Sequence, residues 1–200
     1  LYRFPISDIP LTQNGVLGFQ IENAMASIGA AWALGLDTET IRQGLRSFES
    51  SANAAPGRFN QFQHKGATVI ADYGHNPDAM RALASAINAM KPKRSHVVIS
   101  GAGDRRDEDI RDLTRVLGNS FDNVILYQDQ CQRGREDGEV LKLLQEGLVG
   151  TTKAKQVKEI TGEFLAIDTA LNDLSEGDIC LILIDQVEES LAYLKQKVQV

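Results

Sequence analysis

The run Asp72-Tyr73-Gly74-His75-Asn76-Pro77-Asp78 brings four polar side chains together between an apolar segment and a helix-favouring one. The Asp72 carboxylate is suited to accept hydrogen bonds from sugar hydroxyls, and the His75 ring can stack on a base or bind a purine edge. Asn76 both donates and accepts, and the free N–H groups of the following helix favour an anion. The run indicates a nucleotide site, although a helix cap at Asn76 or Asp78 with a surface His75 explains the same residues.

Two later loops carry residues suited to a second, charged ligand. The loop 101–107 (GAGDRRD) has glycines that let backbone approach a ligand, and Arg105 and Arg106 could clamp phosphate or carboxylate. The loop lacks the dinucleotide fingerprint, because arginine stands where the third glycine belongs. The loop 129–135 (DQCQRGR) has arginines around Gly134. An ordinary strand-to-helix turn also explains the first loop, and a solvated loop also explains the second.

Arg58 follows Pro56-Gly57, at the end of the small polar run 49–57 (ESSANAAPG). We interpret this run as a linker and place a domain boundary after residue 56, which gives domains 1–56 and 57–200. An arginine at this junction could contact a ligand held between the domains, or pair with an acidic neighbour.

The elements that position these residues alternate between strand and helix after the linker. Continuous apolar runs predict parallel strands, each followed by an amphipathic helix, at 67–72, 96–100, 123–127, 155–160 and 179–184. A strand at 58–63 joins the first of them through a turn at 64–66. The run 179–184 (ICLILI) is the most apolar and is predicted to be central. The fold class expected is α/β, a Rossmann-like, mostly parallel sheet with helices on both faces, whose ligands bind at the carboxyl ends of the strands.

A helical hairpin is predicted before the linker. Its first helix has apolar residues at helical spacing, at Ile21, Met25, Ile28 and Trp32. We expect this stripe, with Trp32, to lie in a core. Gly35 is expected to end the first helix, and Asp37 or Thr38 to cap the second.

Composition narrows the function classes. Apolar residues make up 42% of 200 residues and the net charge is −6, which excludes disorder and disfavours a nucleic-acid binder. No apolar run is long enough to span a membrane, so we expect no membrane partner and a cytoplasmic location. Of the two cysteines, Cys131 is interpreted as incidental and Cys180 as core packing. Because the sequence starts at Leu1 without Met, we expect a piece of a longer chain.

The order of the motifs resembles the Mur ligase superfamily from about residue 19 to the end. The matching segments are 19–26 (FQIENAMA), 57–59 (GRF), 72–79 (DYGHNPDA) and 101–105 (GAGDR). The third is close to the family's Asp-Tyr-Ala-His-Asn-Pro signature. In the family these segments belong to the end of a central ATPase domain, here the helical remnant 1–56, and to a C-terminal Rossmann-like domain. The Gly74 variant, the loop 129–135 and the ending 184–189 (IDQVEE) look most like members that build an aspartate–arginine polymer.

The resemblance implies an ATP-dependent amide ligase. ATP would phosphorylate a carboxylate, an amine would attack the acyl phosphate, and ADP and phosphate would leave. Arg58 and Asp72 would then contact ribose or phosphate, and His75 and Asn76 would lie near the base. The residues that would shape the site of the incoming amine are Gly103, Asp104, Arg105, Asp129, Arg133 and Arg135. If that amine is arginine, Asp104 or Asp129 is the better partner for its guanidinium.

Two departures from the family limit what this chain can do. The family's phosphate loop, ending Gly-Lys-Thr/Ser, is absent, and so are its acidic Mg²⁺ ligands. We therefore expect ATP and Mg²⁺ to bind only together with upstream domains, and the chain alone to be inactive. The expected partners are arginine, an aspartate-containing polymer and those upstream domains, within a homo-oligomer.

Two other functions fit parts of the pattern. One is a peptidoglycan or folylpolyglutamate ligase of the same family, although 129–133 (DQCQR) lacks the Asp-Asn-Pro-Arg of the diaminopimelate-adding member. The other is a non-catalytic α/β binding module. A phospho-receiver version is disfavoured, because Asp72 has no second acid beside it and Asp185-Gln186 stands where a lysine is expected.

Overall fold

The computed structural model describes residues 3–48, 50–128 and 132–198. The chain divides into two compact units, Leu1–Ser50 and Ser51–Val200. The division falls inside the predicted linker 49–57, a few residues before the boundary predicted after residue 56.

The first unit is the predicted helical hairpin. Two 3₁₀ turns, η1 (Ile6–Asp8) and η2 (Pro10–Thr12), precede α1 (Gly18–Ala33) and α2 (Thr38–Ser47). Gly35 has φ +84° just after α1, a left-handed conformation that suits the end of a helix. The Asp37 carboxylate accepts a 2.9 Å hydrogen bond from the Thr40 N–H and caps α2, as predicted.

The prediction that Trp32 lies in a core is wrong. Trp32 is 63% exposed and Met25 is 65% exposed, whereas α1 buries Gln20 and Ala24. The apolar spacing correctly predicted a helix, but whether its apolar face is buried depends on which other element covers that face. The described partner helix α2 buries only Ile41, so it covers a narrow strip of α1.

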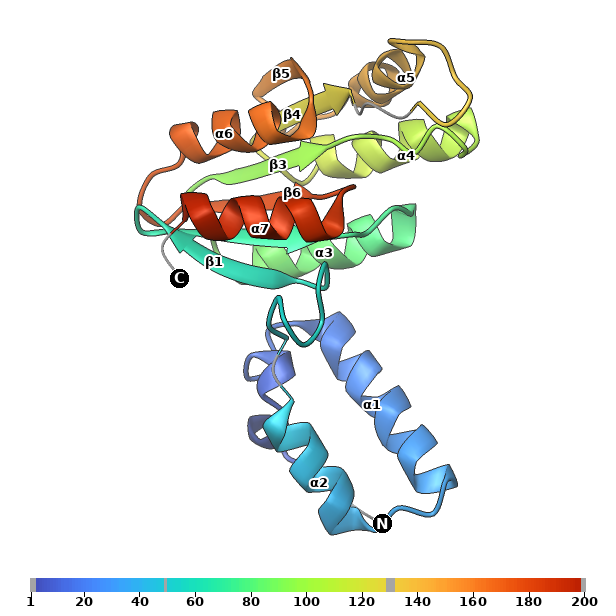
Figure 1. Cartoon of the computed structure of the whole chain (residues 1–200), viewed down its shortest axis with the longest axis vertical. Helices are drawn as coiled ribbons and strands as arrows, with labels where there is room; N and C mark the ends of the chain where they lie inside the picture. The colour runs from blue at the N-terminus through green and yellow to red at the C-terminus, as the bar shows by residue number, and fades with distance from the viewer. Residues whose placement is uncertain (1–2, 49, 129–131, 199–200) are drawn as a thin grey trace. The chain divides into compact units, whose positions relative to one another are not determined.

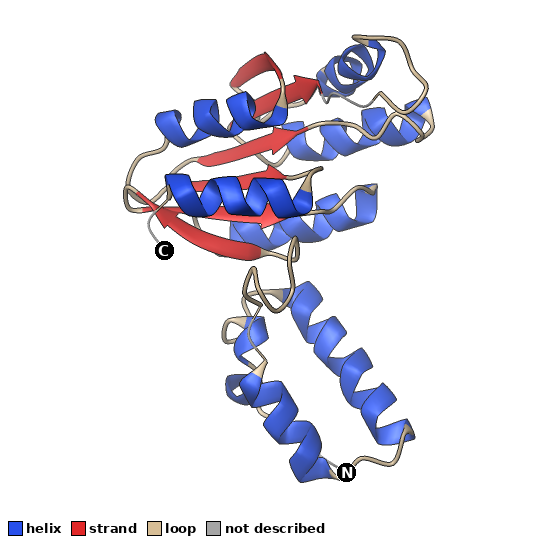
Figure 2. Ribbon diagram, viewed as in Figure 1, coloured by secondary structure: helices blue, strands red, loops and turns tan. Residues whose placement is uncertain are grey.

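The second unit is built on one sheet. Within the described residues the strands are β1 (Asn60–His64), β2 (Ala67–Asp72), β3 (Ser95–Ile99), β4 (Asn123–Gln128), β5 (Gln156–Thr161) and β6 (Ile179–Leu183). Their order is β1-β2-β6-β3-β4-β5 (Figures 1 and 2). β1 is antiparallel to β2, and every other pair is parallel. The most apolar strand, β6, is central, as predicted.

Helices cover both faces of this sheet, which confirms the predicted fold class. They are α3 (Pro77–Ala89), α4 (Asp107–Gly118), α5 (Glu139–Leu148), α6 (Glu163–Asp173) and α7 (Val187–Lys197). One core cluster joins α6 and α7 to the sheet and contains the fully buried Cys180. On the other face α4 packs against both α3 and α5 (Figure 1). No described helix meets the length and hydropathy that a bilayer span requires.

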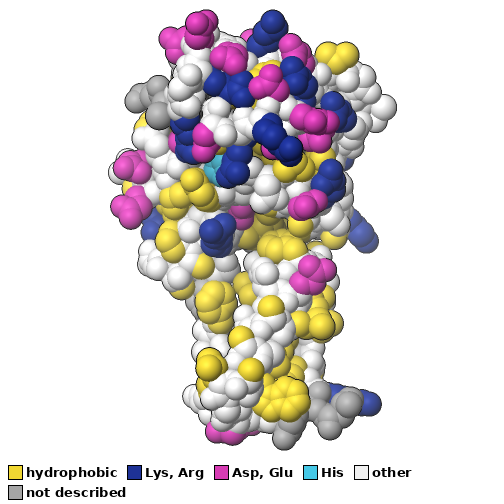
Figure 3. Space-filling model, turned by 90° about the vertical axis from the view of Figure 1, so that its right-hand side faces the viewer, with side chains coloured by type: hydrophobic (Ala, Val, Ile, Leu, Met, Phe, Trp, Pro, Cys, Tyr) yellow, Lys and Arg dark blue, Asp and Glu magenta, His cyan; other side chains and the backbone are white. Residues whose placement is uncertain are grey.

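The parallel register brings the loops after β2, β3, β4 and β6 to one edge of the sheet. Asp72 at the end of β2 is paired with Leu183 of β6, and Val98 of β3 is paired with Ile182. Loops that follow neighbouring parallel strands must therefore start side by side. Figure 3 turns this edge toward the viewer and shows Lys and Arg side chains interspersed with Asp and Glu. We call this the carboxyl edge.

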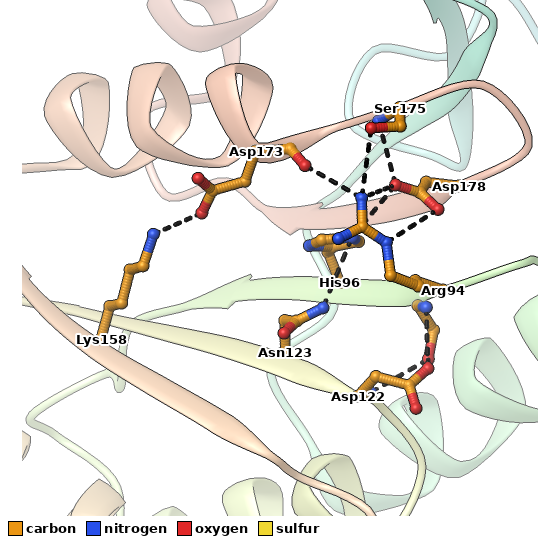
Figure 4. Close-up of polar contacts among 9 residues, drawn as sticks. Arg94, His96, Asp122, Asn123, Lys158, Asp173, Ser175 and Asp178 are labelled. Atoms are coloured by element: carbon orange, nitrogen blue, oxygen red, sulfur yellow. Dashed lines mark hydrogen bonds and ion pairs between the residues drawn. The ribbon is translucent and has the colours of Figure 1, made fainter.

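The opposite, amino edge holds a structural ion pair between a buried carboxylate, Asp178, and the half-exposed Arg94. Asp178 is almost fully buried and accepts hydrogen bonds from the Arg94 guanidinium and the Ser175 N–H (Figure 4). His96 Nε2 lies 3.6 Å from the same carboxylate. Burial would raise the pKa of Asp178, but Arg94, Ser175 and His96 hold it below its ordinary value. The cluster ties the start of β3 to the loop before β6.

This cluster predicts a pH dependence of stability. Burial lowers the pKa of His96 below its ordinary value near 6.5, although Asp178 opposes the shift. The folded state thus disfavours charged His96, and stability is lost as the pH falls below about 6.5, where the unfolded chain takes up the proton first. The free energy of unfolding should fall between about pH 7.5 and about pH 5.5, and fall less in His96→Gln.

Urea-induced unfolding of the second unit, followed at both pH values, measures this free energy and checks the expectation. His64→Gln is the comparison variant: burial also lowers the pKa of His64, but that ring is more exposed, so its replacement should reduce the pH dependence less than His96→Gln does. An identical pH dependence in His96→Gln and the wild type would contradict the account.

Candidate functional site at the carboxyl edge

Asp72 organises the first loop of the carboxyl edge. Its Oδ2 accepts a 2.9 Å hydrogen bond from the Phe59 N–H, and its Oδ1 accepts a 2.7 Å bond from the Gly74 N–H. Burial raises the pKa of Asp72, while these two bonds and the charges of Arg58 and His75 act against the rise. The bonds fasten the start of β1 to the loop after β2. They also fix Phe59, whose φ of +52° is unusual for a bulky residue.

The four residues predicted to contact the nucleotide lie together around this carboxylate. Arg58 is exposed beside Asp72, next to Gly57, whose carbonyl accepts the Tyr73 N–H. His75 Nδ1 lies 2.6 Å from the Tyr73 carbonyl oxygen, and its ring is tilted against the Tyr73 ring. The Asn76 amide oxygen accepts the Ala79 N–H and caps α3, which matches the alternative of a helix cap. The amide nitrogen of Asn76 is still a donor.

Arg135 fastens the loop after β4 to the loop after β3. Its Nε donates to the Gly103 carbonyl and its Nη2 donates to the Arg105 carbonyl, both at 2.7 Å. The same guanidinium pairs with Asp107 and Glu139. Because these protein groups use all of its nitrogens, Arg135 acts in this structure as a cross-link between two loops.

Gly103 permits the close approach of these two loops. A Cβ atom at this position would lie 2.0 Å from the Gln132 carbonyl oxygen, far inside van der Waals contact. The lack of a side chain at Gly103 therefore allows two loops of the same chain to pack against each other. The sequence pattern alone indicated a close approach but did not reveal its partner.

Arg133 connects the loops further. Its guanidinium lies 3.0 Å from an Asp185 carboxylate oxygen and 3.5 Å from an Asp104 oxygen. Burial alone would lower the pKa of Arg133, but Asp185, Tyr73 and Asp104 raise it above the ordinary value, so the side chain stays charged. The same Asp185 oxygen lies 3.7 Å from His75 Nε2. Asp185 thus contacts both His75, in the loop after β2, and Arg133, in the loop after β4.

The structure brings most of the predicted site residues together. Around Asp72 lie Arg58, His75 and Asn76. A second group follows β3 and β4 and consists of Gly103, Asp104, Arg105, Arg133 and Arg135. Asp129 and Cys131 lie outside the described residues. We call the first set the nucleotide group and the second set the amine group; their ligands remain predictions.

The sequence alone did not assign a role at the carboxyl edge to Asp185. A residue just before a helix is typical of an N-cap, but the N-cap of α7 is Gln186, and the Asp185 side chain faces Arg133 and His75. The signal that could have assigned Asp185 to the site is its position directly after the central strand, because ligands bind at the carboxyl ends of parallel strands. Glu163 was missed as well, because it is separated from this turn by a helix and a strand.

The packing at Gly103 predicts a specific defect. In Gly103→Ala the new Cβ must push the Gln132 backbone away, which strains the Arg135 bonds and should lower stability by about 1–3 kcal/mol. Denaturation and limited proteolysis of the loop after β4 check this. Gly29→Ala is the control, because nothing beyond its chain neighbours and its own helix backbone lies within 4 Å of the added Cβ, and a helix gains about 1 kcal/mol from alanine. Unchanged stability and proteolysis in Gly103→Ala would show that the loops are not in this contact.

Comparison with known proteins agrees with this geometry. Residues 57–183 match the family model of the glutamate ligase domain of Mur ligases. The cyanophycin synthetase of Geminocystis herdmanii is 38% identical over 189 residues, 94% of this chain and 22% of that protein. The cyanophycin synthetase of Synechocystis sp. is 34% identical, with the same coverage of both chains. This chain therefore spans about a fifth of the length of these curated relatives.

Other relatives share the fold with lower identity. The diaminopimelate-adding UDP-N-acetylmuramoyl-L-alanyl-D-glutamate ligase of Bradyrhizobium diazoefficiens is 33% identical over 168 residues, 82% of this chain and 32% of that protein. The folylpolyglutamate synthase of Mycobacterium tuberculosis, solved with ADP and AMPPCP, has a TM-score of 0.64 at 21% identity, covering 82% of this chain and 37% of that one. Since the family model covers more than half of the chain, and the predicted resemblance is confirmed, the chain belongs to the Mur ligase family.

Proposed function

We propose that this chain is the C-terminal part of an ATP-dependent amide ligase of the cyanophycin synthetase type. The reaction proposed is the joining of arginine to the side-chain carboxylate of a poly-aspartate backbone through an acyl phosphate. The observation that carries the proposal is the match of 94% of the chain to curated cyanophycin synthetases. The arrangement of two polar groups side by side at the carboxyl edge supports a ligase that holds two ligands together.

The nucleotide group would contact ATP. Both Asp72 oxygens accept backbone N–H groups, and each oxygen has a second lone pair with which to accept a ribose hydroxyl. Arg58, exposed beside Asp72, would contact a phosphate, and the His75 ring would lie near the base. Among the described residues no group of three His, Cys, Asp or Glu side chains is arranged to hold a metal. Within this proposal, Mg²⁺ is assigned to ligands in upstream domains.

The amine group would contact arginine. Asp104 is the more exposed of the two carboxylates around Arg133 and makes the longer contact, 3.5 Å against 3.0 Å. A substrate guanidinium can exchange with Arg133 at Asp104 at low cost, because exposed ion pairs contribute little stability. Arg133 would then remain paired with Asp185 and lie free to contact a carboxylate of the substrates.

A peptidoglycan ligase is the second candidate. The observation in its favour is the 33% identity to the diaminopimelate-adding ligase of Bradyrhizobium diazoefficiens over 82% of this chain. The two candidates differ in the amine that they add. A purified full-length ligase that incorporates diaminopimelate and ignores arginine would favour this candidate.

The ATP contact predicts the effect of Arg58→Ala. In the full-length ligase this change should raise KM for ATP by about tenfold, because a charge-assisted phosphate contact is lost. The control is Arg81→Ala, an exposed arginine of α3 that pairs with Asp78. KM for ATP is measured by steady-state kinetics at saturating arginine. Equal KM values for ATP in Arg58→Ala and the wild type would contradict the assignment.

The arginine contact predicts the effect of Asp104→Asn. KM for arginine should rise by about tenfold with little change in KM for ATP, since the amide lacks the charge that pairs with a guanidinium. Asp112→Asn, a half-buried acid in α4 that pairs with Arg115, is the control. The 200-residue chain alone should show no arginine incorporation. An Asp104→Asn enzyme with wild-type kinetics, or an active isolated chain, would be inconsistent with the proposal.

A further inference from the structure

Glu163 is a buried carboxylate at the first position of α6, only 3% exposed. Its Oε1 accepts hydrogen bonds from the Asp185 N–H at 3.1 Å and the Ser190 hydroxyl at 2.6 Å. Its Oε2 accepts the Gln186 N–H at 3.2 Å and lies 3.5 Å from the Gln186 side-chain nitrogen. All four donors belong to the turn between β6 and α7 or to the first turns of α7.

One of these bonds supplies a partner that the start of α7 lacks. The first N–H groups of a helix have no partner within the helix, and the N-cap residue Gln186 provides no side-chain cap. Glu163 accepts the Gln186 N–H from another helix, and its negative charge is favourable near the positive end of α7. The buried carboxylate is satisfied by these donors, as a buried charge must be.

The consequence for the carboxyl edge is the position of Asp185. Glu163 fixes the backbone N–H of Asp185 and of the next residue, so the Asp185 side chain leaves a rigid turn. From there one carboxylate oxygen lies 3.0 Å from Arg133 and 3.7 Å from His75 Nε2. Because those two residues belong to different groups, the position of Asp185 sets the spacing between the amine group and the nucleotide group.

We propose that Glu163 is a positioning residue for the ligase reaction, acting through Asp185 on Arg133 and His75. The inference rests on the proposed function, because it assigns ligands to the two groups. Glu163 itself contacts no substrate. Its role is to hold the turn after β6 so that the two ligands meet at a fixed distance.

A purely structural cap makes a different prediction from a positioning residue. If Glu163 only stabilised α7, its replacement would lower stability and leave the kinetics of the folded enzyme unchanged. If it acts through Asp185, its replacement must raise KM for arginine, and that effect must vanish once the Asp185 carboxylate is removed. A double-mutant cycle separates the two.

The test uses the full-length ligase with Glu163→Gln, Asp185→Asn and the double variant. We expect KM for arginine to rise by about tenfold in each single variant, and the double variant to resemble Asp185→Asn alone. The control is Asp168→Asn, since Asp168 is another α6 acid that bonds α7, but it does so through the Tyr193 hydroxyl at 2.7 Å and not through the turn at Asp185. This control should keep wild-type kinetics.

Each outcome has a definite meaning. Additive effects of Glu163→Gln and Asp185→Asn, or a KM for arginine unchanged in Asp185→Asn, would overturn the inference. Asp185→Asn leaves the turn intact, so this second criterion applies even where Glu163→Gln does not fold. A wild-type ligase that fails to use arginine would instead overturn the proposed function. In that case amide hydrogen exchange at Asp185 and Gln186, faster in Glu163→Gln than in Asp168→Asn, still tests whether Glu163 holds the turn.

Discussion

The position of β6 between β2 and β3 is the constraint on which the candidate site depends. Because these strands are parallel and in register, the loops that follow them start at one edge, next to the loop after β4. Side chains far apart in the sequence then come within contact distance, as Arg133 and Asp185 do at 3.0 Å. The apolar residues of the strands stabilise the sheet, and the polar residues of the loops are therefore available to bind ligands.

Most of the polar groups at this edge form hydrogen bonds that hold the loops in position relative to one another and to the sheet. Asp72 fastens β1 to the loop after β2, Arg135 fastens two loops together, and Glu163 fastens the turn before α7. Such bonds make the edge rigid before any ligand arrives, and rigid groups bind ligands with less loss of conformational entropy. Exposed charged residues of this edge, such as Arg58 and Asp104, are then the ones expected to meet ligands.

The sequence predicted the elements well because their signals are local. The strand predicted at 67–72 has those bounds in β2, and the helix predicted to follow it is α3. Trp32 was misplaced because a helical stripe does not reveal what covers it. The links of Asp185 to Glu163 and Arg133 could not be predicted, since they join residues 22 and 52 positions apart on separate elements. Only the packing of α6 and the path of the loops bring them together.

The central claim is that the loops at the carboxyl edge meet ATP in the assembled ligase. Amide hydrogen exchange of the full-length enzyme, with and without ATP and Mg²⁺, tests it most directly. The account predicts slower exchange on nucleotide addition in the segments 57–60 and 73–76, with no change at the amino-edge cluster of Arg94 and Asp178. Exchange in those two segments that is unaffected by saturating nucleotide would contradict it.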